Sequence, residues 1–119
     1  MTTDLNKDVV RRSYRVYATG NLDVLDDVIA DDYVDHNPLP GQGPGREGVK
    51  AKVAASRDGL SDVDVQFDDQ VAEGDKVASR ITLRARHESG ADVLVRLIAI
   101  SQVVEGRIVA EWGIADTQG

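Results

Sequence analysis

The sequence predicts an α+β domain in which two to three N-terminal helices pack on a curved antiparallel sheet. Before Gly59 the apolar residues recur at helical spacing, and after it they alternate with polar residues. Helices followed by a four-stranded meander are typical of α+β domains whose helices cover one face of the sheet. The turn signals that separate the four strands are Glu73-Gly74-Asp75, Glu88-Ser89-Gly90 and Glu105-Gly106-Arg107.

Length and composition indicate a single folded domain over residues 1–119. A chain of 119 residues has the usual size of one domain. Hydrophobic residues make up 41% of it and charged residues 29%, which is ordinary for a globular protein and argues against disorder.

Two helices are predicted within the first 30 residues. Thr3 or Asp4 can cap the first helix, and Gly20 can end it in the left-handed conformation. Asn21 then caps a second helix that follows almost without a linker. The apolar stripes are Val9, Val10, Tyr14 and Tyr17 in the first helix, and Leu22, Leu25, Val28 and Ile29 in the second.

A loop and a third helix complete the helical half of the chain. Residues 33–48 contain too much Pro and Gly for a regular element to cross them. A short helix over residues 46–57 follows and buries Val49 and Val53.

The strand over residues 93–104 is apolar on both faces, whereas the other strands have one polar face. We therefore expect it either to be central or to be covered on its outer face by another subunit. The helices can cover only one face of the sheet, and soluble monomers rarely expose large apolar patches. We expect the second face to be covered by a second copy of the chain in a homodimer. The residues expected in that interface are Leu94, Ile98, Ile100 and Val104.

Charge and composition exclude several classes of protein. The net charge is -7 and no basic stripe offsets it, so nucleic acid is not an expected partner. The chain has no cysteine, and its His, Asp and Glu residues show no metal-ligand spacing, so we expect no metal. No apolar run approaches the roughly 20 residues that span a bilayer, and the first residues are polar. We expect a cytoplasmic protein without membrane association.

Four blocks of the sequence together resemble the SnoaL-like polyketide cyclases of the ester cyclase type. The blocks are YVDHNP at 33–38, GQGPGREGVK at 41–50, VAEGDKV at 71–77 and GRIVAEWGIADT at 106–117. They occur in the order found in that family. The resemblance implies the nuclear transport factor 2-like (cystatin-like) fold, which also includes ketosteroid isomerase and limonene-epoxide hydrolase. In this fold a cone-shaped, half-open sheet holds a small apolar ligand at its mouth.

The resemblance also implies an activity, the cofactor-free intramolecular aldol cyclisation of a polyketide methyl ester. The family's acid/base is an Asp in the pattern W-x-x-x-D, which Trp112 and Asp116 match, so Asp116 inherits that role. Alternation from Ile108 to Asp116 would put this carboxyl at the end of an apolar row that faces the cone interior. Such surroundings favour proton exchange near neutral pH. The alternative is an Asp116 that lies in solvent.

His36 and the aromatic residues are the other candidates for the site. His36 follows Asp35 and could reach the cone mouth to shuttle a proton, or it could be a structural loop residue. A phenol on the first helix could donate to a developing oxyanion, although core aromatics also recur at helical spacing. We expect the chain's few aromatic residues to bind substrate: Tyr14, Tyr17, Tyr33, Phe67 and Trp112.

Departures from the family pattern leave a second class of function open. Glu111 stands where the family has a His before the Trp, and Ala99 stands where a polar residue is frequent. An apolar cup with one carboxyl also fits a non-catalytic small-molecule-binding or dimerisation module. Hydroxylase and hydrolase chemistry are further alternatives within the fold. A pocket closed to water with Asp116 inside it would favour the enzyme, and a collapsed cup would favour the module.

Overall fold

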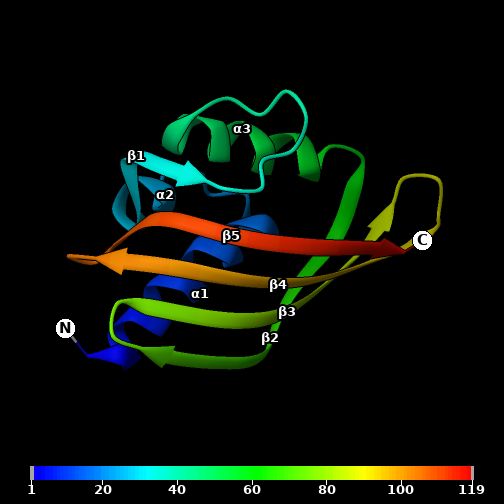
Figure 1. The fold of residues 1–119 in the computed structure, drawn as a ribbon. Coiled ribbons are helices and arrows are strands. Elements are labelled where there is room, and N and C mark those ends of the chain that lie inside the picture. The colour runs from blue at the N-terminus through cyan, green and yellow to red at the C-terminus, as the bar shows by residue number, and fades with distance from the viewer. Residues whose placement is uncertain (1, 119) are drawn as a thin grey trace.

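The computed structural model describes residues 2–118, which form three helices and five strands (Figure 1). The helices precede the long strands, as the sequence predicts, and the α+β class is confirmed. In chain order the elements are α1 (Thr3–Thr19), α2 (Val24–Val28), β1 (Ile29–Asp35), α3 (Gly45–Arg57), β2 (Leu60–Glu73), β3 (Lys76–His87), β4 (Asp92–Val104) and β5 (Arg107–Gln118).

The five strands form one sheet in the order β1-β5-β4-β3-β2. The antiparallel meander from β2 to β5 and the central place of β4 confirm two predictions. The sheet is mixed rather than purely antiparallel, because β1 joins its edge parallel to β5. Such a parallel neighbour, from a segment about 75 residues upstream of β5, leaves no local turn signal in the sequence.

Strand β1 also shortens the second helix. The prediction that Ile29 belongs to the apolar stripe of that helix is wrong, because α2 ends at Val28 and Ile29 pairs with Ile108 of β5. Asn21 is not its cap, since α2 begins at Val24 after Asp23. An apolar residue at the end of a helix fits the helical spacing of apolar residues and the alternation of a strand equally well. Here the pairing of Ile29 with a distant strand makes it a strand residue.

Helix α1 has the predicted C-terminus and an N-terminus shifted by one residue. Thr2, not Thr3 or Asp4, is the N-cap, and its hydroxyl oxygen accepts from the Leu5 amide at 3.2 Å. Gly20 ends the helix with φ 75°, and its amide donates to the Val16 carbonyl oxygen at 2.8 Å. Among residues 2–118 no helix combines the length and apolarity needed to cross a membrane.

Helix α3 begins where the preceding loop packs against it. Gly45 adopts φ 67°, and a Cβ there would lie 2.7 Å from the Asp31 carbonyl oxygen. A Cβ on Gly48 would overlap the Gly43 carbonyl oxygen. The missing side chain of Gly48 therefore lets the loop over residues 36–44 lie directly on the first turn of α3, and that of Gly45 lets the helix begin against β1.

The core fills one end of the concave side of the sheet and leaves the other end open. Figure 1 shows α1 passing behind the strands and α3 beside β1. The core joins residues of all three helices to the sheet where β3 begins, β4 ends and β5 begins. Its most deeply buried large side chains are Val10, Leu25, Val28, Val53, Val77 and Ile108.

A β-bulge early in β5 reverses which side chains face the helices. Val103 pairs with Ile108 and Gln102 pairs with Ala110, so Val109 is an extra residue on β5. Ile108 therefore faces the core, whereas Trp112 and the residues in step with it face the outer side. The prediction that residues from Ile108 to Asp116 share one face is wrong, because one inserted residue exchanges the two faces.

Candidate functional site

A cavity of about 480 Å³ occupies the open end of the concave face. Its sheet wall is apolar, and the helices and β1 supply most of its polar groups. From β2, β3 and β4 come Leu60, Val65, Ile81, Leu83, Val95 and Leu97, among others. From α1, β1 and α3 come Tyr14, Tyr17, Tyr33, Asp35, Lys52 and Arg57. The volume suits a small molecule of drug-like size.

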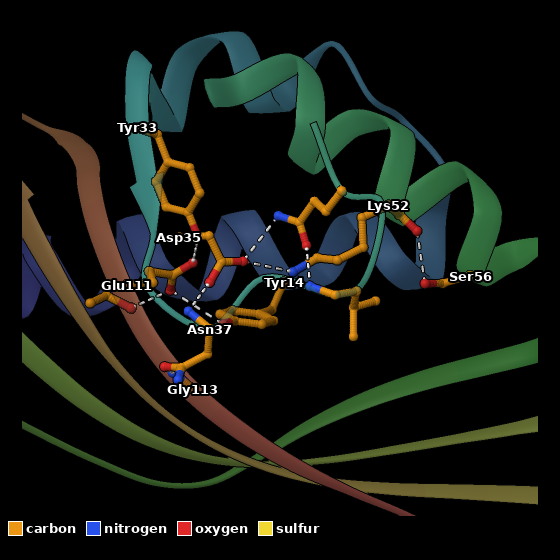
Figure 2. A network of polar contacts seen from close by, with 11 residues as sticks. Tyr14, Tyr33, Asp35, Asn37, Lys52, Ser56, Glu111 and Gly113 are labelled. Atoms are coloured by element: carbon orange, nitrogen blue, oxygen red, sulfur yellow. Dashed lines mark hydrogen bonds and ion pairs between the residues drawn. The ribbon is translucent and has the colours of Figure 1, made fainter. Parts of the chain in front are cut away.

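Glu111 of β5 is the centre of a hydroxyl network in the cavity wall (Figure 2). Its Oε2 accepts from the Ser101 hydroxyl at 2.5 Å and from the Tyr14 hydroxyl at 3.2 Å. Its Oε1 accepts from the Tyr33 hydroxyl at 3.0 Å. The four groups come from β5, β4, α1 and β1, so the carboxyl lies where the elements that close the cavity meet.

The electrostatics of the network keep the phenols protonated and disfavour a charged carboxyl. Burial raises the pKa of Glu111 above its ordinary value, although the bonds from Ser101, Tyr33 and Tyr14 and the charge of Lys52 oppose that effect. Burial, followed by the charge of Glu111, also raises the pKa values of Tyr14, Tyr17 and Tyr33. The phenols are thus hydrogen-bond donors at neutral pH.

A second carboxylate, Asp35 at the end of β1, is held by three donors beside this network (Figure 2). Its Oδ1 accepts from the Asn37 amide at 2.9 Å. Its Oδ2 accepts from Gln42 Nε2 at 3.0 Å and lies 3.4 Å from Lys52 Nζ. Burial acts to raise the pKa of Asp35, but these bonds and the Lys52 charge outweigh it and lower the pKa below its ordinary value. Asp35 is therefore a fixed anion.

The loop after β1 is fastened to the cavity by the same residues. Gln42 Oε1 accepts from the Leu39 amide at 3.0 Å, and Asn37 Oδ1 accepts from the Gly113 amide at 3.0 Å. The His36 amide donates to the Glu111 carbonyl oxygen at 2.9 Å and so extends the pairing of β1 with β5. The loop thereby positions Asn37 and Leu39 in the cavity lining.

Three of the predicted substrate-binding residues line the cavity and two do not. Tyr14, Tyr17 and Tyr33 contribute to the lining. Phe67 lies outside it and packs edge-on against the Tyr14 ring, with ring centroids 6.1 Å apart. Trp112 also lies outside it, because the bulge in β5 turns its side chain to the outer face.

The structure places both candidate catalytic residues outside the cavity lining, so Asp116 does not face the interior as expected and His36 fits its alternative as a loop residue. Asp116 is an exposed residue of β5 opposite Arg96 and lies outside the cavity lining, for the same reason as Trp112. His36 stacks on Trp112 with ring centroids 4.4 Å apart and planes 6° apart. The two aromatic rings meet outside the cavity lining, so His36 does not face the cavity.

Three polar residues of the cavity lining, Glu111, Asp35 and Lys52, were not predicted as site residues from the sequence. A signal was present at Glu111, because a carboxyl replaces the family's His at a position between apolar residues. The Glu111 side chain faces the cavity only because of the bulge at Val109. Within residues 2–118 no group of three or more His, Cys, Asp or Glu side chains could hold a metal ion.

This arrangement defines the class of nuclear transport factor 2-like proteins. In that class, helices cover the concave face of a bent sheet, and polar groups lie at the base of an open cavity. A protein from Catenulispora acidiphila described as having a ketosteroid isomerase-like fold shares this architecture, with TM-score 0.74 and 18% identity over 89% of this chain and 83% of that one. The family model for the SnoaL-like polyketide cyclases matches residues 7–119, and the chain belongs to that family.

Two solved structures are more similar in sequence. TsrD from Streptomyces laurentii has TM-score 0.87 and 25% identity, over 98% of this chain and 91% of that one. A loop-truncated variant of IdmH, a protein of Streptomyces antibioticus, has TM-score 0.81 and 31% identity, over 93% of this chain and 92% of that one. No curated protein matches this chain.

Proposed function

We propose that this protein is a cyclase-type enzyme that uses cofactor-free acid/base catalysis on a small hydrophobic carbonyl compound. The observation that carries the proposal is the carboxyl of Glu111, which lies in an otherwise largely apolar cavity and has a raised pKa. A raised pKa makes the carboxylate a stronger base, which favours the abstraction of a proton from carbon. Membership of the SnoaL-like family supports an intramolecular aldol reaction.

The proposed reaction needs only one proton carrier. The Glu111 carboxylate removes a proton from a carbon beside a carbonyl group, and the C–H electron pair forms an enolate. The enolate carbon attacks a second carbonyl of the same molecule, which forms a C–C bond and leaves an alkoxide. The alkoxide takes the proton back from Glu111, so the product is an isomer of the substrate and no co-reactant is consumed.

Tyr14 is the group proposed to stabilise the enolate oxygen. Its bond to Glu111 is the longest of the three at 3.2 Å, beyond the usual O–H···O range, so a substrate oxygen can replace it at small cost. Donors aimed at a developing oxyanion in a water-poor site contribute strongly to catalysis. The raised pKa of Tyr14 keeps its proton available for this bond.

Hydrogen–deuterium exchange at a carbon acid tests the proton transfer without the natural substrate. With 2-tetralone as the probe, NMR in D₂O should show exchange of its α-protons faster than in buffer. Glu111→Gln keeps the size and hydrogen-bonding capacity of the side chain but removes the base. We expect it to lower the exchange rate by about 100-fold or more.

The matched variant is Asp116→Asn, which removes the carboxyl that the family resemblance implies. We expect Asp116→Asn to retain most of the exchange, because this side chain lies outside the cavity lining. Circular dichroism of both variants checks that they are folded. Loss of exchange in Asp116→Asn together with retention in Glu111→Gln would overturn the assignment of Glu111.

A non-catalytic binding module is the second candidate, and one observation favours it. The Glu111 carboxyl already accepts three hydrogen bonds, which satisfies most of its acceptor capacity. In that case the protein would bind 2-tetralone or a similar ligand without accelerating the exchange. A cytoplasmic location is likewise a proposal, which rests on the composition of the sequence.

A further inference from the structure

The cavity has one apolar wall and one polar wall. The apolar wall is the concave face of β2, β3 and β4. On the opposite side α3 presents Lys52, Ser56 and Arg57. A neutral hydrophobic ligand has no charge to pair with these two cations. Their place in one cavity wall stands out in a protein whose net charge is -7.

Lys52 has capacity for an additional anionic partner. Its ammonium has three donors, and among the described residues it is paired with Asp35, at 3.4 Å. Asp35 depends less on this pair than Lys52 does, since Asp35 also accepts hydrogen bonds from the Asn37 amide and from Gln42 at shorter distances. The Lys52 side chain is 24% exposed, and in Figure 2 it extends from α3 toward Asp35.

Arg57 adds a second positive charge that is fixed in place. Its Nη1 donates to the carbonyl oxygens of Tyr17 and Ala18, at 2.7 and 2.9 Å, at the C-terminal end of α1. These acceptors are neutral carbonyl groups, so the guanidinium charge still acts on the cavity.

We infer that the ligand is an amphipathic carbonyl compound that carries a free carboxylate, held by Lys52, with its apolar body against the sheet wall. The inference rests on the proposed function only for the carbonyl group and for the location of the ligand. An ester, which the family resemblance implies, has no charge to pair with Lys52. Charge-assisted hydrogen bonds are about twice as strong as neutral ones, so Lys52 distinguishes an acid from its neutral analogues.

Calorimetry with two probes of equal size tests this inference. The probes are 2-naphthoate and 2-naphthamide at pH 7.5, which share the ring system and differ in charge. We expect the wild type to bind naphthoate about tenfold more tightly than the amide. Lys52→Met should reduce this preference to about twofold or less while leaving amide binding intact, and Lys52→Arg should retain the preference.

Lys50→Met is the matched control, because Lys50 lies on the same helix and pairs with Asp26 and Glu47 away from the cavity lining. It should leave the preference unchanged. Glu111→Gln should also keep it even where carbon-acid exchange is lost, which separates this inference from the proposed catalysis. Equal or tighter amide binding by the wild type, undetectable naphthoate binding at millimolar concentration, or a preference that survives Lys52→Met would overturn the inference.

Discussion

Ser101 shows how one buried hydroxyl sets the chemistry of the residue beside it. Its side chain is fully buried and donates the shortest of the three bonds to Glu111. Hydrogen bonds to the charged form of a carboxyl lower its pKa, and here this bond opposes the effect of burial. Ser101 is therefore a positioning residue that governs the pH range in which Glu111 can act as a base.

Replacing Ser101 should move the pH profile of carbon-acid exchange. Because the carboxylate is the base, exchange is present above the pKa of Glu111 and disappears as the pH falls through it. Ser101→Ala removes a bond that lowers this pKa, so the midpoint should move to higher pH. The exchange rate of 2-tetralone measured across pH gives the midpoint directly.

Ser79→Ala is the matched control for that measurement. Ser79 is also buried on the concave side of the sheet, but its hydroxyl oxygen accepts from Gln70 Nε2 at 3.1 Å. Each variant should lose about 1 kcal/mol of unfolding free energy, whereas Ser101→Ala alone should shift the profile. Equal shifts in both variants, or a shift of Ser101→Ala to lower pH, would contradict the role given to Ser101.

Among single residues, the place of Tyr14 and Tyr17 in the cavity could be predicted from the sequence, whereas that of the Glu111 carboxyl could not. Tyr14 and Tyr17 lie on a strongly periodic helix, so their shared face follows from helical spacing. Glu111 and Asp116 both lie on β5, where the predicted face depends on strict alternation. The bulge at Val109 breaks that alternation, and no single residue in the segment signals it.

At the scale of the element, the start of α3 depends on two glycines for different reasons. Gly45 needs its positive φ, whereas Gly48 needs to lack a side chain because the Gly43 carbonyl oxygen occupies that space. Periodicity predicted the extent of α3 to within one residue. It could not predict β1, whose partner strand lies far away in the sequence.

The steric requirement at Gly48 predicts a large effect for a small substitution. Gly48→Ala should lower the free energy of unfolding by about 1–3 kcal/mol, because backbone atoms must move to admit the methyl group. Urea denaturation followed by circular dichroism measures this change.

Gly113→Ala is the matched substitution in the same protein. A Cβ at Gly113 would meet its nearest atom, the Ile98 carbonyl oxygen, at 3.6 Å, which is ordinary van der Waals contact. We expect its free energy of unfolding to stay within about 0.5 kcal/mol of wild type. If Gly48→Ala were as stable as Gly113→Ala, the loop would not be packed on α3 as described.

At the scale of the whole molecule, exposed apolar side chains gather on the outer face of the sheet, above all on β4 and β5. Ile98 and Ile114 are direct neighbours on β4 and β5 and are 61% and 78% exposed. Val71, Ile100 and Trp112 add exposed apolar surface on neighbouring strands. Soluble monomers rarely expose large apolar patches, so we propose that two copies bury these side chains in a homodimer.

Sedimentation equilibrium tests the homodimer. The wild type should be dimeric at tens of micromolar, and Ile98→Asp should be monomeric because each copy would bury a carboxylate in the interface. Leu5→Asp is the control, since Leu5 is also an exposed aliphatic residue, 53% exposed, but lies on α1 away from the outer sheet face. A monomeric wild type, or a dimeric Ile98→Asp, would contradict the proposal.

The parallel pairing of β1 with β5 has a consequence for the order in which the protein forms. The hairpins of the meander join neighbouring segments and close short loops, whereas β1 must wait for a partner about 75 residues downstream. Closing a long loop costs entropy, which makes pairing between distant segments slow, and during synthesis β1 leaves the ribosome long before β5 does. We expect the pair of Tyr33 and Glu111 to be among the last to form, so that the cavity acquires its polar base only when the fold is otherwise complete.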